Sequence, residues 1–260
     1  MDMIGRAVSD LISRERLGAA ATVVVGPSIG DKALIEAGEG IVAGSLPDHL
    51  DESVVADAYQ LMEVEQNRTL DYGEESVYIE TIAPQPRLVI IGAVHIGQEL
   101  TTLADHLGFR VIVTDSRPAF TTRERFPQAE IHVGWPDDVM PLIDLDRRTY
   151  VVILSHDARF EDPVLPWLLD SDVRYIGAMG SRRTALKRAE RLNEAGYDAE
   201  SIRRIHGPVG LDIGAETPGE VAVSILAEMI QVRYGHGTGL SLAGTEGRIH
   251  AQRADEPADL

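Results

Sequence analysis

The sequence predicts an α/β protein in which a small α+β N-terminal domain precedes a Rossmann-like, doubly wound parallel sheet. Residues 88–91 form an aliphatic run that ends at Gly92, and a helical pattern follows, which is how such a sheet usually begins. Apolar strands then alternate with helical segments, as in parallel sheets. Pro84 and Pro86 mark a short, stiff connection before this region. We therefore expect a small α+β domain over residues 1–83, a Rossmann-like domain over 84–235 and a flexible C-terminal tail over 236–260.

The N-terminal domain shows both helical and strand-like patterns. Apolar residues at helical spacing precede Gly18, a residue that commonly ends a helix, and a second set with spacings of three and four follows residue 50. Short apolar runs separated by glycines indicate strands. We expect helices over 2–17 and 51–65, and strands over 20–25, 33–37, 41–43 and 77–82. No catalytic constellation is evident in this domain.

The second domain repeats a strand, a turn and a helix. The expected strands are 88–91, 110–114, 131–133, 150–154 and 173–176, and the expected helices are 98–107, 137–143, 161–170 and 182–195. The start of the last helix is well specified, with Thr217 as N-cap, Pro218 at the first helical position and Glu220 completing a capping box. The chain after Gly235 is glycine-rich, then polar and acidic, which predicts a disordered tail.

Composition excludes several classes of function. The net charge of −18 argues against general nucleic-acid binding and against attraction to anionic membranes. The absence of cysteine excludes disulfides, thiolate zinc sites and cysteine nucleophiles, and the histidines have no metal-ligand spacing. No signal-peptide core and no membrane-length apolar run is evident, so we expect a cytoplasmic protein. Neither a nucleophile elbow nor a Walker loop is present.

The turn after the first strand of the second domain departs from the dinucleotide-binding pattern G-x-G-x-x-G. Gly92 and Gly97 match that pattern, but Val94 occupies the position of the middle glycine. A side chain there should keep a pyrophosphate away from the backbone. Ala93 and His95 lie in the same turn, where His95 could donate to a phosphate or cap the helix.

Ligands of open α/β sheets bind at the carboxyl ends of the strands, so polar residues in the loops 92–97, 115–118, 155–157 and 177–183 should converge. Asp115 lies where a ribose-binding acid belongs, and a turn cap is an equal alternative. Arg117 lies in the same loop. His156 and Asp157 are the best catalytic candidates, and His156 could instead be a ligand contact or structural.

The segment Gly180-Ser181-Arg182-Arg183 opens a helix and carries free amides, a hydroxyl and two guanidinium groups. This combination suits a phosphate, although a solvated helix start is the alternative. Glu216 flanks the last helix, where the dipole alone favours a carboxylate; it completes the set of candidate ligand-binding residues.

Six stretches of the second domain resemble the Rossmann domain of the XdhC/CoxI family, accessory proteins of xanthine dehydrogenase and carbon monoxide dehydrogenase type molybdenum hydroxylases. They are VIIGAVHIG at 89–97, VTDSRP at 113–118, RFP at 125–127, SHD at 155–157, YIGAMGSRR at 175–183 and GPVGLDIGAETPGEVAVSILAE at 207–228. The family turn usually reads G-A-G-H, and Val94 replaces its second glycine. The family's N-terminal glycine–cysteine motifs are absent, so the resemblance does not extend to a step that uses a thiol of this chain.

The resemblance implies a cytoplasmic, usually dimeric factor that binds molybdenum cofactor, as molybdopterin or its dinucleotide form. Such a factor protects the cofactor while a cysteine desulfurase sulfurates it and delivers it to an apo molybdenum hydroxylase. We interpret the chain as an accessory cofactor-binding chaperone rather than a turnover enzyme. The alternatives are an NAD(P)-binding oxidoreductase, which Val94 argues against, and a relative that binds no cofactor and acts as a scaffold.

Overall fold

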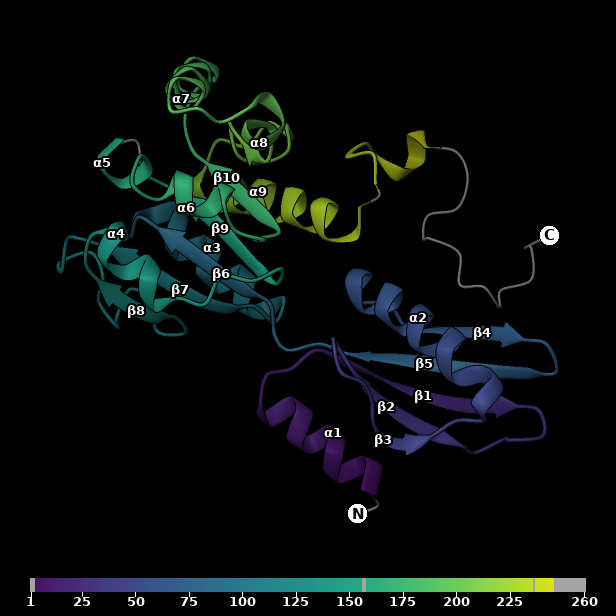
Figure 1. Cartoon of the computed structure of the whole chain (residues 1–260). Helices are drawn as coiled ribbons and strands as arrows, with labels where there is room; N and C mark the ends of the chain where they lie inside the picture. The colour runs from purple at the N-terminus through teal and green to yellow at the C-terminus, as the bar shows by residue number, and fades with distance from the viewer. Residues whose placement is uncertain (1–2, 156–157, 236, 246–260) are drawn as a thin grey trace. The chain divides into compact units, whose positions relative to one another are not determined.

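The computed structural model describes residues 3–155, 158–235 and 237–245, and the chain divides into two compact units (Figure 1). One unit comprises Gln85–Leu240, and the other comprises Met1–Pro84 together with Ser241–Leu260. Most of the predicted tail, 236–260, lies outside the described residues, and η2 (Leu242–Gly244) is a short 3-10 helix within it. No helix among the described residues has both the length and the apolar character needed to cross a membrane.

The larger unit contains a six-stranded parallel sheet of order β11-β10-β9-β6-β7-β8. This order confirms the predicted doubly wound, Rossmann-like fold, because β6 is central and the strand order reverses between β6 and β9. The strands are β6 (Arg87–Ile91), β7 (Arg110–Asp115), β8 (Glu130–Val133), β9 (Thr149–Ile153), β10 (Tyr175–Ala178) and β11 (Ile205–His206).

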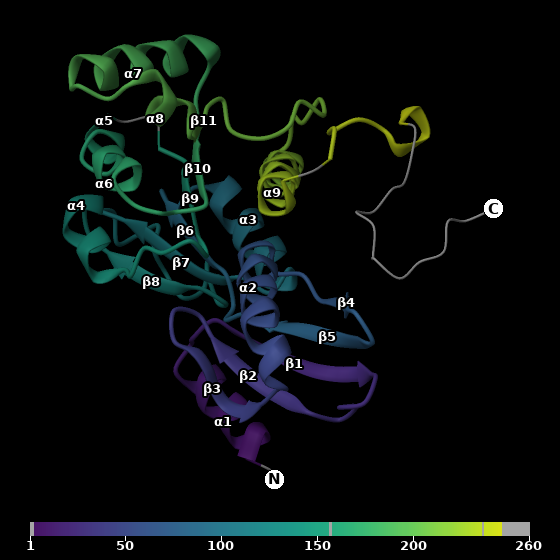
Figure 2. The ribbon, with the colours of Figure 1, turned by 45° about the vertical axis from the view of Figure 1, so that its right-hand side comes forward.

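Helices cover both faces of this sheet, as Figure 2 shows. On one face, α3 (His95–His106) and α9 (Pro218–Tyr234) pack over a core that includes Leu88, Ile90, Leu100 and Ile225. On the other face the core receives side chains from α4 (Pro136–Val139), η1 (Met140–Leu142), α5 (Ala158–Glu161), α6 (Leu165–Leu169), α7 (Arg182–Glu194) and, at its margin, α8 (Ala199–Arg203). The strands β6 and β9 are buried on both faces, which is why they read as unbroken apolar runs.

Two predicted helices are interrupted by proline. The helix expected over 161–170 is instead the pair α5 and α6, with Pro163 between them and Pro166 in the first turn of α6. The helix expected over 137–143 is the short α4 followed by η1, which has Pro141 in its first turn. Proline lacks the N–H that continues a helix, so each segment restarts there.

The smaller unit has a five-stranded antiparallel sheet of order β3-β2-β1-β5-β4. Helix α2 (Asp48–Val64) packs on it and buries Leu50, Val54, Ala58 and Leu61, while α1 (Met3–Ser13) packs against β2 and β3. The strands are β1 (Gly18–Val25), β2 (Lys32–Glu36), β3 (Gly40–Ser45), β4 (Arg68–Tyr72) and β5 (Glu75–Ile82). The sequence did not predict β4, α8 or β11.

Candidate functional site

The loops that follow β6, β7, β9 and β10 lie at the carboxyl edge of the parallel sheet, around the point where the strand order reverses. The turn after β6 contacts the end of β9, because a Cβ added to Gly92 would lie 3.3 Å from the Ser155 nitrogen. Gly92 also has a φ of +113°, which L side chains rarely adopt. The backbone conformation therefore favours glycine here, and a Cβ would in addition be a tight fit.

The remaining residues of this turn pack closely. A Cβ on Gly97 would lie 3.2 Å from the Gly92 carbonyl oxygen, so Gly97 permits close packing of α3 on β6. Val94 has an ordinary φ of −88°, and its side chain packs partly buried against the core beneath α3 and α9. Its backbone therefore has no conformational need for glycine. His95, the first residue of α3, is exposed.

Asp115 is fully buried and both of its carboxylate oxygens accept hydrogen bonds. Oδ2 accepts from the Ala93 N–H at 2.9 Å and from Arg117 Nη2 at 2.7 Å, and Oδ1 accepts from Arg117 Nε and the Arg117 N–H. Burial alone would raise the pKa of this carboxyl group, but the hydrogen bonds from Arg117 and Ala93 hold it below its usual value. Asp115 thus makes turn contacts, and its role toward a ribose stays a prediction.

Arg117 forms the outer side of this loop. Its guanidinium group pairs with Asp115 and lies over the Phe120 ring, 4.3 Å from the centroid, with its side chain about half exposed. Arg125 lies over the same ring and donates to Gln98 on α3. The loop after β7 is thereby held against the first turns of α3.

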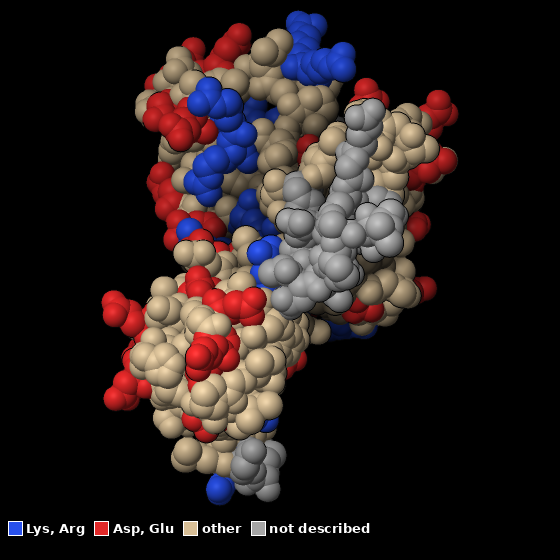
Figure 3. Space-filling view, turned by 90° about the vertical axis from the view of Figure 1, so that its right-hand side faces the viewer, with Lys and Arg blue, Asp and Glu red and all other residues tan. Residues whose placement is uncertain are grey.

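The start of α7 carries two exposed cations. Ser181 is the N-cap, and its hydroxyl accepts a hydrogen bond from the Thr184 N–H at 3.2 Å. Arg182 and Arg183 are exposed in the first turn, where the helix dipole already favours an anion. An anion here would contact backbone amides and guanidinium groups, while the Ser181 hydroxyl serves as the cap. On the face drawn in Figure 3, Lys and Arg side chains gather along a hollow of unit 85–240.

A buried ion pair that the sequence did not reveal holds α7 in place. Arg188 on α7 pairs with Glu161 on α5 through Nε and through Nη2, which lies 3.0 Å from Oε2, and Nη2 also donates to the Met179 carbonyl. Arg188 and Glu161 are 2% and 3% exposed. Arg191 adds a second pair with Glu161 at 3.1 Å. The pair connects α5, which follows β9, to the loop after β10.

The remaining residues predicted from the sequence to bind a ligand or to act in catalysis are His156, Asp157 and Glu216. His156 and Asp157, the catalytic candidates, lie outside the described residues. Glu216 is exposed before α9, and its N–H donates to Glu220, which also closes the predicted capping box with Thr217. No group of three or more His, Cys, Asp or Glu residues suited to a metal ion is present in the part of the chain that the structure describes.

A further polar cluster lies beneath the glycine-rich loop at 207–214. Glu228 on α9 accepts hydrogen bonds from the Tyr175 hydroxyl and the Gly210 N–H, and His206 Nδ1 lies 3.2 Å from its Oε1. Burial would raise the pKa of Glu228, but these three partners lower it overall. Its contacts fix the loop onto α9. Tyr175, Gly210 and Glu228 lie in the stretches that carry the family resemblance, but the sequence did not indicate that they form a cluster with His206.

Comparison with known proteins identifies the family of the larger unit. The XdhC Rossmann domain family matches residues 88–229. The chain is similar to a probable xanthine dehydrogenase subunit of Bacillus subtilis (35% identity, 61% of this chain and 46% of that protein). It is also similar to the molybdenum cofactor insertion chaperone PaoD of Escherichia coli (31% identity, 58% and 41%). The match spans less than half the length of either relative.

A solved structure shares the fold. A crystal structure described as a xanthine dehydrogenase from Bacillus halodurans aligns with a TM-score of 0.53 and 21% identity, over 91% of this chain and 97% of that one. The alignment supports the fold alone. The family match covers more than half of the chain and includes the turn at Gly92, the Asp115 loop and the start of α7. The chain belongs to the XdhC Rossmann domain family.

Proposed function

We propose that this protein is an accessory maturation factor that binds molybdenum cofactor, as molybdopterin or its dinucleotide form, and delivers it to a molybdenum hydroxylase. Family membership and the similarity to a molybdenum cofactor insertion chaperone support this role. The cofactor is cargo in this proposal, so the protein requires a site that recognises it without a reaction of its own.

The observation that carries the proposal is the convergence of anion-binding features at one edge of the sheet. The turn at Gly92 packs tightly against the chain after β9 at this edge, and α7 begins with Arg182 and Arg183 exposed. Molybdopterin carries a phosphate and its dinucleotide form a diphosphate, which helix amides and guanidinium groups bind well. The donor set therefore fits the phosphate end of the cargo.

We assign the remaining candidates by their positions. Gly92, Ala93, His95 and Gly97 form one wall of the proposed site, and the Asp115–Arg117 pair forms its neighbour. Because Asp115 is fully buried and the Arg117 side chain is about half exposed, Arg117 is the member of this pair that would face the polar body of the cofactor. His156 and Glu216 complete the proposed set, and the catalytic roles of His156 and Asp157 stay predictions.

Cofactor retention tests the proposal. Molybdopterin that co-purifies with the protein is oxidised and measured as its fluorescent derivative, and retention is compared among variants. Replacing both Arg182 and Arg183 with alanine should weaken retention at least about tenfold, because two charge-assisted contacts are lost. Arg6→Ala with Lys187→Ala removes the same charge from exposed positions on α1 and the second turn of α7. That control should retain the cofactor.

Three outcomes would contradict the proposal. Equal retention by the double arginine variant and its control, with unchanged circular dichroism, would exclude the start of α7 as the binding site. Micromolar binding of NAD(H) or NADP(H) in a titration would instead support the oxidoreductase alternative. Protein with neither pterin nor nucleotide binding would support the scaffold alternative.

The proposal also includes partners. We expect a homodimer that receives sulfur from a cysteine desulfurase and transfers the cofactor to an apo-hydroxylase in the cytoplasm. Light scattering of the purified protein measures its molar mass and so tests for the dimer. Co-purification with each tagged partner, with and without cofactor, measures the two complexes.

A further inference from the structure

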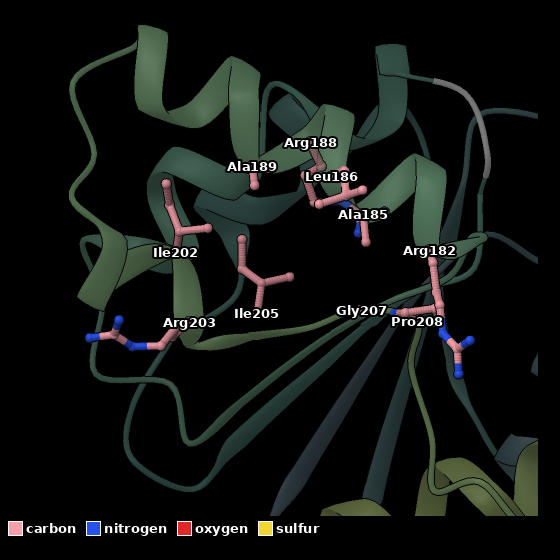
Figure 4. Close-up of a pocket in the computed structure, with 10 residues that line it drawn as sticks. All are labelled: Arg182, Ala185, Leu186, Arg188, Ala189, Ile202, Arg203, Ile205, Gly207 and Pro208. Carbon is pink, nitrogen blue, oxygen red and sulfur yellow. The ribbon is translucent and has the colours of Figure 1, made fainter.

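A cavity of about 530 Å³ lies between α7, α8 and the edge strand β11 (Figure 4). Gly207 and Pro208, which follow β11, line the same cavity as Arg182, the first residue of α7. The cavity thus begins near the carboxyl edge of the sheet and extends beneath α7 toward Arg203 at the end of α8. Its volume is in the range of small-molecule sites.

Small residues at successive helical turns create this space. Ala185 and Ala189 are four residues apart on α7, so both lie on the face that lines the cavity. Gly207 brings the chain after β11 close to Arg188, because a Cβ there would lie 2.7 Å from Arg188 Nη1. Protein interiors are normally filled to crystal-like density, and larger residues at the two alanine positions would close the gap. Alanine at these two positions leaves the cavity open.

The lining is apolar with cationic ends. Ile202 and Ile205 lie along it, and Leu186, whose side chain is 67% exposed, leaves apolar surface uncovered beside it. Figure 4 shows Arg182 and Arg203 on opposite sides of the group of apolar side chains. Exposed apolar surface within a concave site favours a ligand that covers it.

The charged residues that line the cavity are all arginines. They are Arg182, Arg188 and Arg203, in a chain with a net charge of −18. Arg188 is neutralised by its buried pair with Glu161. Within residues 3–155, 158–235 and 237–245, neither Arg182 nor Arg203 forms a hydrogen bond or an ion pair through its guanidinium group, and Asp198 attracts Arg203 only through space. Figure 4 shows both guanidinium groups directed outward from the apolar side chains, so each can pair with an anionic group at the rim of the cavity.

We propose that this cavity binds a small organic anion whose apolar ring body lies against Ile202 and Ile205 and whose acidic group pairs with Arg203. The site is distinct from the proposed cofactor site, although Arg182 borders both. A nucleoside monophosphate and an aromatic carboxylate share the required chemistry. The test below leaves Arg182 intact, so its result does not depend on cofactor binding.

Binding of 8-anilinonaphthalene-1-sulfonate, a fluorescent anion with an apolar ring body, tests the site. The wild-type protein should show one saturable site. Ala189→Phe should raise the Kd at least about tenfold, because the ring fills the space that the probe occupies. Arg203→Ala should raise it about fivefold, since one ion pair of roughly the strength of a surface pair is lost. Lys187→Ala, exposed on α7 but not in the lining, is the control and should leave the Kd unchanged.

A neutral probe of similar shape, N-phenyl-1-naphthylamine, separates charge from apolar contact. Its binding should weaken in Ala189→Phe and not in Arg203→Ala. Displacement of the anionic probe by a nucleoside monophosphate or by an aromatic carboxylate distinguishes the two sources of such a ligand. Anionic-probe binding that is the same in wild type, Ala189→Phe and Arg203→Ala would overturn the proposal, and Arg203→Ala keeps this test valid if the phenylalanine variant fails to fold.

Discussion

At the scale of single residues, Asp115 connects the two turns that form the centre of the candidate site. It accepts the Ala93 N–H in the turn after β6 and pairs with Arg117 in the loop after β7. A buried carboxylate with these partners is stable only while it is ionised. The stability of both turns should therefore depend on the ionisation of this one group.

Asp115→Asn should lower the free energy of unfolding by about 2 kcal/mol at neutral pH, because the amide cannot accept every hydrogen bond that the carboxylate accepts. The pKa of Asp115 is lowered in the folded protein. Its contribution is fully present above the unfolded-state pKa of about 3.9 and is lost as the pH falls through the lower folded value. The difference between wild type and variant should therefore shrink below about pH 4.

Urea unfolding at several pH values measures this difference. Asp105→Ala, which removes an exposed carboxylate from α3, is the matched control and should change the free energy of unfolding by less than about 0.5 kcal/mol. A difference between wild type and Asp115→Asn that stays constant down to about pH 3 would show that ionisation of Asp115 does not support the turns.

Sequence reasoning placed these residues but not their partners. The positions of Gly92, Gly97 and Asp115 follow from the strand–turn–helix pattern, and the structure brings the turns together as that pattern predicts. The pairing of Asp115 with Arg117 was not predicted, because a residue two positions away can equally point to solvent. Val94 was predicted only as an obstacle, since the direction of its side chain depends on how α3 and α9 pack.

At the scale of elements, the Glu161–Arg188 pair determines how α7 sits on the larger unit. Arg188→Met would leave the Glu161 carboxylate buried, and the half-exposed Arg191 would be its remaining cationic partner among the described residues. We expect a loss of about 3 kcal/mol in the free energy of unfolding, as for other broken buried pairs. The variant should also retain less molybdopterin, because Arg182 and Arg183 would lose their support.

Two comparisons test this expectation. Arg191→Ala removes a partly exposed partner of the same carboxylate and should cost less than about 1 kcal/mol. The double variant Glu161→Leu with Arg188→Met removes both buried charges and should recover much of the lost stability. Equal stability of Arg188→Met and wild type in urea would contradict the role of the pair.

The start of α9 gives a second element-scale prediction. The Thr217 hydroxyl accepts from the Glu220 N–H, and the Glu220 carboxylate accepts from the Thr217 N–H, which confirms the predicted capping box. Thr217→Ala should lower the free energy of unfolding by about 1 kcal/mol, while Thr217→Ser, which keeps the hydroxyl, should be close to neutral. Chemical denaturation of the three proteins measures both effects.

Elements with strong local patterns were predicted, and elements formed by distant contacts were not. The unbroken apolar runs of β6 and β9 and the cap of α9 are local signals. The two-residue strand β11 has no pattern of its own, because it exists only through pairing with β10. Glu161 and Arg188 are 27 residues apart, and no local feature marks them as partners.

At the scale of the whole molecule, each compact unit has its own core. Val54 and Ala58 of α2 pack with Ile35 and Ile79 of the antiparallel sheet, whereas Leu100 belongs to the core between α3, α9 and the parallel sheet. Units with separate cores can unfold separately. The residues that match the family, 88–229, also lie within one unit, Gln85–Leu240.

Calorimetry of the full chain should therefore show two unfolding transitions. Val54→Ala and Leu100→Ala each create a cavity at a fully buried position and should cost about 2 to 4 kcal/mol. Val54→Ala should lower the Tm of one transition and leave the other unchanged, and Leu100→Ala should do the reverse. A single transition that both variants lower equally would show that the two cores unfold as one cooperative unit, because destabilising either core would then destabilise the whole.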